Sequence, residues 1–264
     1  MSDLNLLHLG EAGSRVVFLH GLFGQGRNWM TIAKAIADAH RVTLVDLPDH
    51  GRSAWTEHID YVDMAAQVAA VLEADGPATV VGHSMGGKVA MVLALTRPDL
   101  VEGLVVADMS PVDYSAEAEA TGGVLGYARI LLDLDLTQVH RREDADRLLA
   151  EQVPNTTIRS FLLQNLRRDG ESGWRWAANL EAVVRDGATL SGWPGAQLAD
   201  RPPYPGRVLW MAGQNSGYVQ PAYEDAMRRW FPHYRKVTIK GAGHWLHSEK
   251  PDVFIDVLRR YLEI

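Results

Sequence analysis

A short glycine-rich segment contains the residue whose type and setting point most directly to chemistry. Ser84 lies in the run Gly-His-Ser-Met-Gly-Gly at 82–87, between an apolar stretch at 79–81 that predicts a strand and a helical pattern from Lys88 onward. A serine on so tight a strand-to-helix turn needs glycine two positions before and two after it, because neighbouring backbone passes close by. The amide of Met85, at the helix start, faces any negative charge that develops. The pattern predicts Ser84 as a nucleophile; the alternative is a glycine-rich turn with a spectator serine.

A serine is a weak nucleophile until a base removes its proton, so a histidine must also be available. His244 ends the run Gly-Ala-Gly-His, which directly follows an apolar strand pattern at 237–239. A glycine-rich loop of this kind can carry an imidazole over the carboxyl ends of a parallel sheet. We therefore predict His244 as the general base. The alternative is that His244 caps the final helix, and His247 is the histidine expected at the surface.

The elements that must position these two side chains follow from the hydrophobic pattern. Short apolar runs rich in β-branched residues alternate with longer helical patterns, which is typical of a parallel sheet with helices on both faces. The predicted strands cover residues 16–19, 42–45, 79–81, 104–107, 208–211 and 237–239. The fold class is therefore α/β, with a mostly parallel sheet.

Three helices of this core have recognisable ends. The first is capped by Asp60 and stopped by Gly76, and the second begins just after Met85 and ends before Pro98. The third is expected to be capped by Ser248 and to close the chain. The first and the third place apolar residues on one face, as helices that cover a sheet must.

One long stretch interrupts the alternation of strands and helices. Residues 112–194 offer helical patterns but no convincing strand, so they predict a helical cap inserted after the strand that ends at Asp108. Its expected helices cover 129–134, 143–152 and 158–168. The predicted organisation is a core domain of residues 1–111 and 195–264 with this cap between the two parts.

Composition excludes several classes of protein. The 264 residues carry 26 Lys and Arg against 33 Asp and Glu, a net charge of −7, which is the wrong sign for a nucleic-acid partner. No apolar run approaches the roughly 20 residues that span a membrane, and the N-terminal segment lacks the pattern of a signal peptide, so a cytoplasmic location is expected. The pattern leaves the oligomeric state open.

Metal and cofactor sites are not indicated either. The chain has no cysteine, which excludes disulfides, thiolate ligands and a cysteine nucleophile. The histidines other than His244 show no HxH or HExxH spacing. No Gly-x-Gly-x-x-Gly follows a predicted strand in the arrangement of a dinucleotide site. We expect no metal and no cofactor.

Five segments together carry a resemblance to a known family. They are His-Gly-Leu-Phe-Gly at 20–24, Asp-Leu-Pro-Asp-His-Gly-Arg-Ser at 46–53, the serine segment at 82–88, Asp-Met-Ser-Pro at 108–111 and Gly-His-Trp-Leu-His at 243–247. In these segments the chain resembles the α/β-hydrolase superfamily over essentially its whole length. It is most similar to the small esterase subfamily that includes bacterial acyl-CoA and short-ester hydrolases.

The resemblance implies an oxyanion hole made of two backbone amides. One follows the His-Gly pair and the other follows the nucleophile, which places them at Leu22 and Met85 in this sequence. Amides aimed at a tetrahedral oxyanion contribute about a hundredfold or more in rate each. The amide of Phe23 is the alternative to that of Leu22. Where the amide of Leu22 is used, Phe23 is expected to line the pocket.

The acid of the expected triad departs from the commonest superfamily pattern. The loop at 213–219, where the acid usually lies, contains no carboxylate, and Ser216 stands in its place. Asp108, at the end of a strand that should neighbour the one bearing Ser84, is the better candidate, as in some superfamily members. An aspartate there would orient the imidazole and stabilise its protonated form. The alternatives are that Asp108 only caps the following turn and that Asp46 is the acid.

These residues predict a serine hydrolase of carboxylic esters with short to medium acyl chains, acting through an acyl-enzyme, with thioesters as a second substrate class. The cap should roof the serine, and basic residues on it could hold the phosphates of a coenzyme A thioester, although solvated helix faces explain them equally well. The expected pocket residues are Phe23, Tyr114, Tyr127, Phe161 and Trp245. The alternatives are lactone or carbon-carbon bond hydrolysis, lyase or peroxidase chemistry, or a small-molecule receptor. The only partner expected is the small-molecule ester or thioester.

Overall fold

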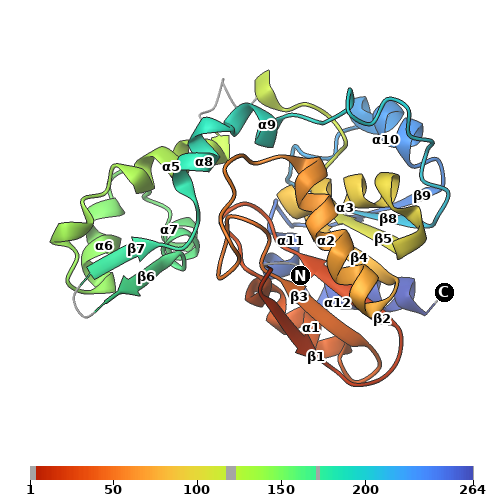
Figure 1. The fold of residues 1–264 in the computed structure, drawn as a ribbon, viewed down its shortest axis with the longest axis horizontal. Helices are drawn as coiled ribbons and strands as arrows, with labels where there is room; N and C mark the ends of the chain where they lie inside the picture. Colours follow the sequence, from red (N-terminus) through yellow and green to blue (C-terminus); the bar gives the residue numbers. More distant parts are fainter. Residues whose placement is uncertain (1–3, 117–122, 171–172, 264) are drawn as a thin grey trace.

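A seven-stranded sheet forms the centre of the molecule (Figure 1). The computed structural model describes residues 4–116, 123–170 and 173–263, so part of the predicted cap and the first three residues of the N-terminal segment lie outside the described residues. The strands are β1 (Leu6–Leu9), β2 (Arg15–Leu19), β3 (Arg41–Val45), β4 (Ala78–His83), β5 (Val101–Ala107), β8 (Val208–Gly213) and β9 (Tyr234–Ile239), in the order β1-β3-β2-β4-β5-β8-β9. Within this sheet β1, at one edge, pairs antiparallel with β3, and the other strands pair parallel. All six predicted strands are confirmed.

The central strands are buried on both faces, which explains their β-branched sequences. Every residue of β2 and β4 is buried, as expected for parallel strands covered by helices on each side. One face packs against α1 (Met30–Ile36) and α12 (Pro251–Leu262), and the other against α2 (Tyr61–Asp75), α3 (Met85–Thr96) and α10 (Glu224–Trp230). The predicted class, α/β with helices on both faces of a mostly parallel sheet, is confirmed.

The predicted ends of α2 are confirmed. The Asp60 carboxylate accepts hydrogen bonds from the amides of Val62 at 2.7 Å and Asp63 at 3.2 Å, which satisfies two of the four amides that a helix start leaves without partners. At the other end Gly76 takes a φ of 99°, a backbone conformation that stops the helix at low cost.

The predicted start of the last helix is wrong. Ser248 does not cap it but lies inside a separate short helix, α11 (Leu246–Glu249), and α12 begins at Pro251. Proline has no amide to leave unsatisfied and fits the first turn of a helix. It also keeps the residue before it out of the helical region, so Lys250 separates the two helices with φ −137° and ψ 58°.

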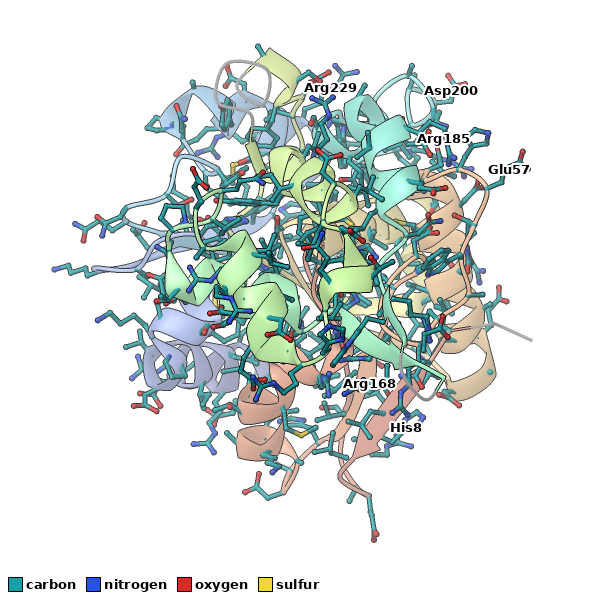
Figure 2. The ribbon with its side chains drawn as sticks, turned by 90° about the vertical axis from the view of Figure 1, so that its left-hand side faces the viewer. His8, Glu57, Arg168, Arg185, Asp200 and Arg229 are labelled. Carbon is teal, nitrogen blue, oxygen red and sulfur yellow. The ribbon has the colours of Figure 1, made fainter. Side chains whose placement is uncertain are left out.

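The chain leaves the sheet after β5 and returns to it at β8, and much of the described chain between them forms the body seen on the left of Figure 1. We call residues 112–194 the cap segment. Its elements are α5 (Gly123–Leu132), η3 (Leu136–Gln138), α6 (Arg142–Leu149), α7 (Thr156–Leu163), β6 (Leu166–Asp169), β7 (Gly173–Trp176), α8 (Leu180–Arg185) and α9 (Gly187–Ser191). Charged side chains such as Arg168 and Arg185 project outward from it (Figure 2).

The expectation of no strand in the cap segment is wrong. β6 and β7 pair antiparallel, with Leu166 opposite Trp176, so the helix expected over 158–168 ends at Leu163. Asn165 breaks it, because its buried side chain donates to the carbonyl of Phe23 in the core at 2.8 Å. Two four-residue strands with charged exposed positions leave almost no alternating pattern, which is why the sequence did not reveal them.

No helix among the described residues is long and apolar enough to cross a membrane.

Candidate active site

Ser84 lies at a strained turn between β4 and α3, at the carboxyl edge of the sheet. Its φ of 53° and ψ of −119° are rare for a residue with a side chain. A Cβ added to Gly82 would collide with the carbonyl oxygen of Gly86, and one added to Gly86 would collide with the backbone of β2. The glycines at both ends of the motif are therefore required by close backbone packing, as the sequence pattern predicts.

The sheet order brings three side chains together at this edge. Ser84 follows β4, Asp108 follows the neighbouring strand β5, and His244 lies in the loop after β9. The Nε2 atom of His244 is 3.0 Å from the Oγ of Ser84, and its Nδ1 is 2.8 Å from an Oδ of Asp108. Asp108 is fully buried and the His244 side chain is 12% exposed. The arrangement gives a hydroxyl, a base and a buried carboxylate in one hydrogen-bonded line.

Asp108 receives two further hydrogen bonds from the loop after β8. The amide of Gly213 donates to its Oδ1 at 2.9 Å, and the hydroxyl of Ser216 donates to its Oδ2, the same oxygen that faces His244. Asp108 also takes a positive φ of 52°. Ser216 stands where the acid usually lies in this superfamily. Its hydroxyl thus donates a hydrogen bond that holds the Asp108 carboxylate in place.

Two aromatic residues that sequence reasoning did not single out hold His244. The Nε2 of His83 donates to the His244 carbonyl at 2.8 Å, and burial lowers the pKa of His83 well below its usual value, so the ring stays neutral. The Tyr218 ring lies 4.2 Å from the His244 ring, tilted by 33°. The only sequence signals were the position of His83 beside the serine and that of Tyr218 in the loop after β8.

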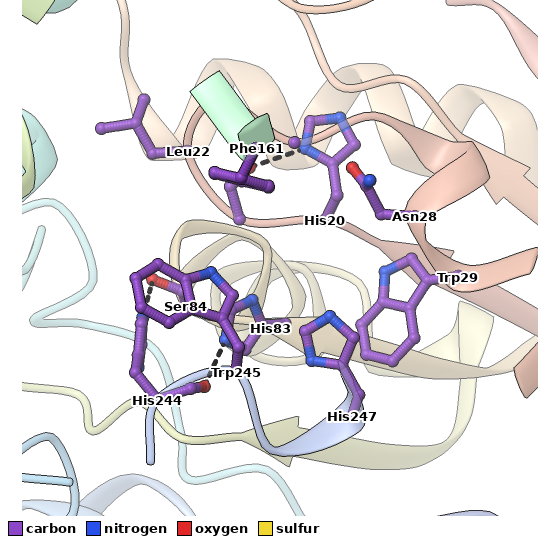
Figure 3. A pocket seen from close by; sticks show the side chains of 12 residues that line it. His20, Leu22, Asn28, Trp29, His83, Ser84, Phe161, His244, Trp245 and His247 are labelled. Carbon is purple, nitrogen blue, oxygen red and sulfur yellow. Dashed lines mark hydrogen bonds between the residues drawn. The ribbon is translucent and has the colours of Figure 1, made fainter. Parts of the chain in front are cut away.

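The turn after β2 lies near Ser84, across the pocket from His244 (Figure 3). Leu22 lines the pocket, and Met85 is the first residue of α3, where amides have no partner within the helix. Phe23 takes a φ of 60° and is fully buried. Its carbonyl accepts hydrogen bonds from Asn165 at 2.8 Å and Gln164 at 3.1 Å, so the cap segment holds this turn in place.

Ser84 opens into a pocket bounded by the turn after β2, the loop after β9 and α7 (Figure 3). Of the five aromatic residues expected on its wall, Phe161 and Trp245 lie there, with ring centroids 6.1 Å apart. The lining residues are His20, Gly21, Leu22, Gly24, Asn28, Trp29, His83, Ser84, Phe161, His244, Trp245 and His247. This wall mixes apolar rings with histidines.

The other three expected pocket residues do not line the pocket. Phe23 packs beneath its turn with no exposed surface. Tyr114 is buried beside the loop after β8, where its hydroxyl donates to the Tyr218 carbonyl at 2.6 Å. Tyr127 is half-buried on α5, against the core cluster. Large aromatic residues are more often core than ligand contacts, and sequence alone does not separate the two.

The rival acid, Asp46, directly follows β3. Its carboxylate accepts hydrogen bonds from the amides of Gly26 at 2.7 Å and Arg52 at 3.0 Å and from the side chain of Asn5 at 2.9 Å. These contacts hold loops together and place no imidazole beside Asp46.

The expectation that His247 lies at the surface is wrong. It is 9% exposed and stacks on Trp29 with ring centroids 4.4 Å apart. Burial and, to a smaller extent, the neighbouring His244 lower the pKa of His247 to about 3. The residue follows His244 by only three positions, so the short helix α11 turns it inward beneath the base.

No group of three or more His, Asp or Glu side chains within the described ranges could hold a metal ion.

Comparisons with known proteins agree with this geometry. A model of the alpha/beta hydrolase family matches residues 16–257. The chain is 37% identical over 262 residues to the sn-1-specific diacylglycerol lipase ABHD11 of Mus musculus, covering 98% of this chain and 84% of that protein. It is 32% identical to Esterase YbfF of Escherichia coli (strain K12), covering 94% and 93% of the two chains.

A solved structure described as a marine microorganism esterase superposes with a TM-score of 0.93 at 29% identity, covering 98% of this chain and 99% of the other. Similarity at this level extends over the sheet and over the cap segment alike. The chain therefore belongs to the alpha/beta hydrolase family and is a carboxylic ester hydrolase.

Proposed function

We propose that the chain hydrolyses esters through an acyl-enzyme formed on Ser84, with His244 as general base and Asp108 as the residue that orients it. The observation that carries this proposal is the line of contacts from the Ser84 Oγ through His244 to Asp108, at 3.0 and 2.8 Å, within one pocket. Each atom in the line has the partner that its role requires.

In the first half of the reaction His244 takes the proton of Ser84 as the oxygen attacks the ester carbonyl. The amides of Leu22 and Met85 would stabilise the negative charge that forms on the carbonyl oxygen. Asp108 holds the Nδ1 proton and stabilises the imidazolium without taking the proton. His244 then protonates the departing alcohol, which leaves the acyl group on Ser84.

In the second half, water enters in place of the alcohol. His244 removes a proton from this water, which attacks the acyl carbonyl and passes through a second oxyanion at the same amides. Return of the proton to Ser84 releases the carboxylic acid. No group beyond the side chains and amides of the chain is needed.

The pocket wall supports esters with short to medium acyl chains. Leu22, Phe161 and Trp245 supply apolar surface next to Ser84. We place thioesters second, because arginines of the cap segment are engaged within the protein. Arg159 pairs with Asp146 at 2.7 Å, and Arg167 donates to the side chain of Gln25 at 2.7 Å.

We also propose that residues 112–194 act as a cap on a core of residues 1–111 and 195–264. Phe161 of this segment lies on the pocket wall, 6.1 Å from the ring of Trp245 in the core. A cover at this place excludes water and strengthens the electrostatic interactions beneath it. The size of acyl chain accepted would then depend on α7.

The direct test is Ser84→Ala, with Ser160→Ala, an exposed serine on α7, as the matched control. We expect Ser84→Ala to lose turnover of p-nitrophenyl butyrate and labelling by a fluorophosphonate, and Ser160→Ala to keep both. Turnover by the wild type would also separate an enzyme from a receptor. Labelling and turnover that survive in Ser84→Ala would contradict the proposal.

A further inference from the structure

Two buried nitrogen atoms on the pocket wall have no hydrogen-bond partner among the described residues. They are the Nε1 of Trp29 and the Nδ1 of His247. Trp29 ends the turn that follows β2, and His247 follows the loop that carries His244. Figure 3 shows both rings at the end of the pocket away from Leu22, beyond His83. Buried polar groups are nearly always hydrogen-bonded, so these two nitrogens indicate a site for a polar group.

The nitrogens of Trp29 and His247 differ from other buried nitrogens without a partner because their residues line the pocket. Trp174 and Trp193 also have a buried Nε1 with no partner among the described residues, but neither residue lines the pocket. Asn28, the neighbour of Trp29, is engaged within the protein: it accepts from the Gln25 amide at 2.6 Å and donates to Gln164 at 2.8 Å. Among the described lining residues, the buried polar atoms without a partner are thus those of Trp29 and His247.

The charge of the wall selects the kind of group that fits. None of the described lining residues is Lys, Arg, Asp or Glu. His20, His83 and His247 are each buried, and burial lowers the pKa of His20 and of His247 to about 3 and that of His83 well below its usual value, so all three rings are neutral. A carboxylate or phosphate would find no countercharge here, and burying it would be costly.

The donor chemistry narrows the choice further. The indole N–H of Trp29 can only donate, so its partner must be an acceptor. The neutral imidazole of His247 can present either an N–H or a lone pair at Nδ1, according to its tautomer. A hydroxyl or a ketone oxygen satisfies both conditions, whereas a hydrocarbon leaves both nitrogens unsatisfied.

We propose that Trp29 and His247 form a hydrogen-bonding subsite for an uncharged oxygen of the substrate, so that the enzyme prefers esters with a hydroxyl or ketone group near the scissile carbonyl. The proposal rests on Ser84 being the nucleophile in this pocket. The oxygen can come from the acyl part or from the alcohol part of the ester, and matched substrate pairs separate these two sources.

The experiment measures kcat/KM for two pairs of similar shape. The acyl pair is p-nitrophenyl levulinate and p-nitrophenyl isocaproate, and the alcohol pair is hydroxyethyl butyrate and propyl butyrate. For each pair we take the ratio of kcat/KM for the oxygen-bearing ester to kcat/KM for the hydrocarbon ester. For one of the two pairs we expect this ratio to fall about tenfold in Trp29→Phe and in His247→Phe. Comparing ratios between variants cancels the intrinsic reactivity of each ester.

Controls separate the subsite from a loss of packing. Trp174→Phe removes a similarly unpartnered indole outside the pocket and should leave both ratios unchanged. His247→Asn keeps a polar side chain and should restore part of the ratio lost in His247→Phe. If Trp29→Phe does not fold, the two His247 variants still decide the question.

Ratios that stay the same in wild type, Trp29→Phe and His247→Phe for both pairs would overturn the subsite. Failure of the proposed mechanism would look different, because Ser84→Ala would then still hydrolyse p-nitrophenyl isocaproate.

Discussion

The sheet and the cap segment hold their shapes in different ways. In the sheet, strands buried on both faces and helices with one apolar face fix the positions of Ser84, Asp108 and His244. The cap segment shares the apolar cluster on one face of the sheet, through residues such as Leu131, Leu162 and Val183. It is also tied to the core by single side chains that bind backbone, such as Asn165, which donates to the Phe23 carbonyl at 2.8 Å. Under our proposal the chemistry lies on the sheet, and the selection of the acyl chain lies on the cap segment.

This difference predicts two kinds of variant. Substitutions at the strand ends should lower kcat with little change in fold, because the sheet positions the groups independently of any one of them. Substitutions at the ties to the cap segment should change stability and KM more than kcat. The predictions below test this division, from the largest expected effect to the smallest.

Asp108→Asn should lower kcat about a thousandfold or more, because the amide cannot hold the His244 Nδ1 proton and stabilise the imidazolium as the carboxylate does. Steady-state kinetics on p-nitrophenyl butyrate measure the effect. Asp225→Asn, an exposed acid on α10, is the matched control and should be unaffected. A loss of only a few fold in Asp108→Asn would move the role to another carboxylate.

Lys88→Met should destabilise the protein by about 2 to 3 kcal/mol and raise KM. Lys88 is 1% exposed, and its ammonium donates to the carbonyl of Ser191 at 2.8 Å and to that of Gly192, where the chain leaves the cap segment. Its Nζ also lies 5.0 Å from the ring centre of Tyr114. Thermal unfolding and steady-state KM measure how much the contact of Lys88 with Ser191 and Gly192 contributes.

The division between the two regions would fail if Lys88→Met lowered kcat as strongly as Asp108→Asn while leaving stability and KM unchanged. Lys34→Met, on α1, is the control for loss of a lysine away from this contact.

Ser216→Ala should lower kcat about tenfold, because it removes the hydroxyl that donates to the oxygen of Asp108 facing His244. Ser216→Thr keeps a hydroxyl and should recover most of the rate. Equal activity of the alanine and threonine variants would show that the serine only fills space.

The stability of the wild type should fall as the pH drops below about 6.5, because buried neutral histidines must take up a proton on unfolding. Burial lowers the pKa of His247 to about 3, beside His83 and His244, so between pH 6.5 and 3 the unfolded state binds one more proton at this residue. His247→Phe should reduce the slope of unfolding free energy against pH by up to about 1.4 kcal/mol per unit. Denaturant unfolding at pH 6 and 4.5 measures it, and His233→Phe, at an exposed histidine, should keep the full slope.

What the sequence predicted follows the same division. Ser84 and His244 could be recognised because a strand pattern precedes each, and because glycines surround Ser84 and directly precede His244. Asp108 could be recognised because it follows a strand beside that of Ser84. The hairpin of β6 and β7 could not, because its strands are short and carry charged exposed residues.

The pocket was the least predictable part. Phe23 and Tyr114 have the residue types of ligand contacts but satisfy the core instead, whereas His247 has the type of a surface residue and is buried against Trp29. Whether an aromatic or histidine ring faces a cavity depends on the packing of several elements at once. No spacing within a single segment records that packing.

The most direct test of the account is mass spectrometry of the enzyme stopped with acid during turnover of p-nitrophenyl butyrate. We predict an added butyryl group on the peptide that contains Ser84, absent in Ser84→Ala and strongly reduced in His244→Ala. An acyl group found on another residue would contradict the account. Rapid turnover by the wild type with no acyl group on Ser84 would contradict it too.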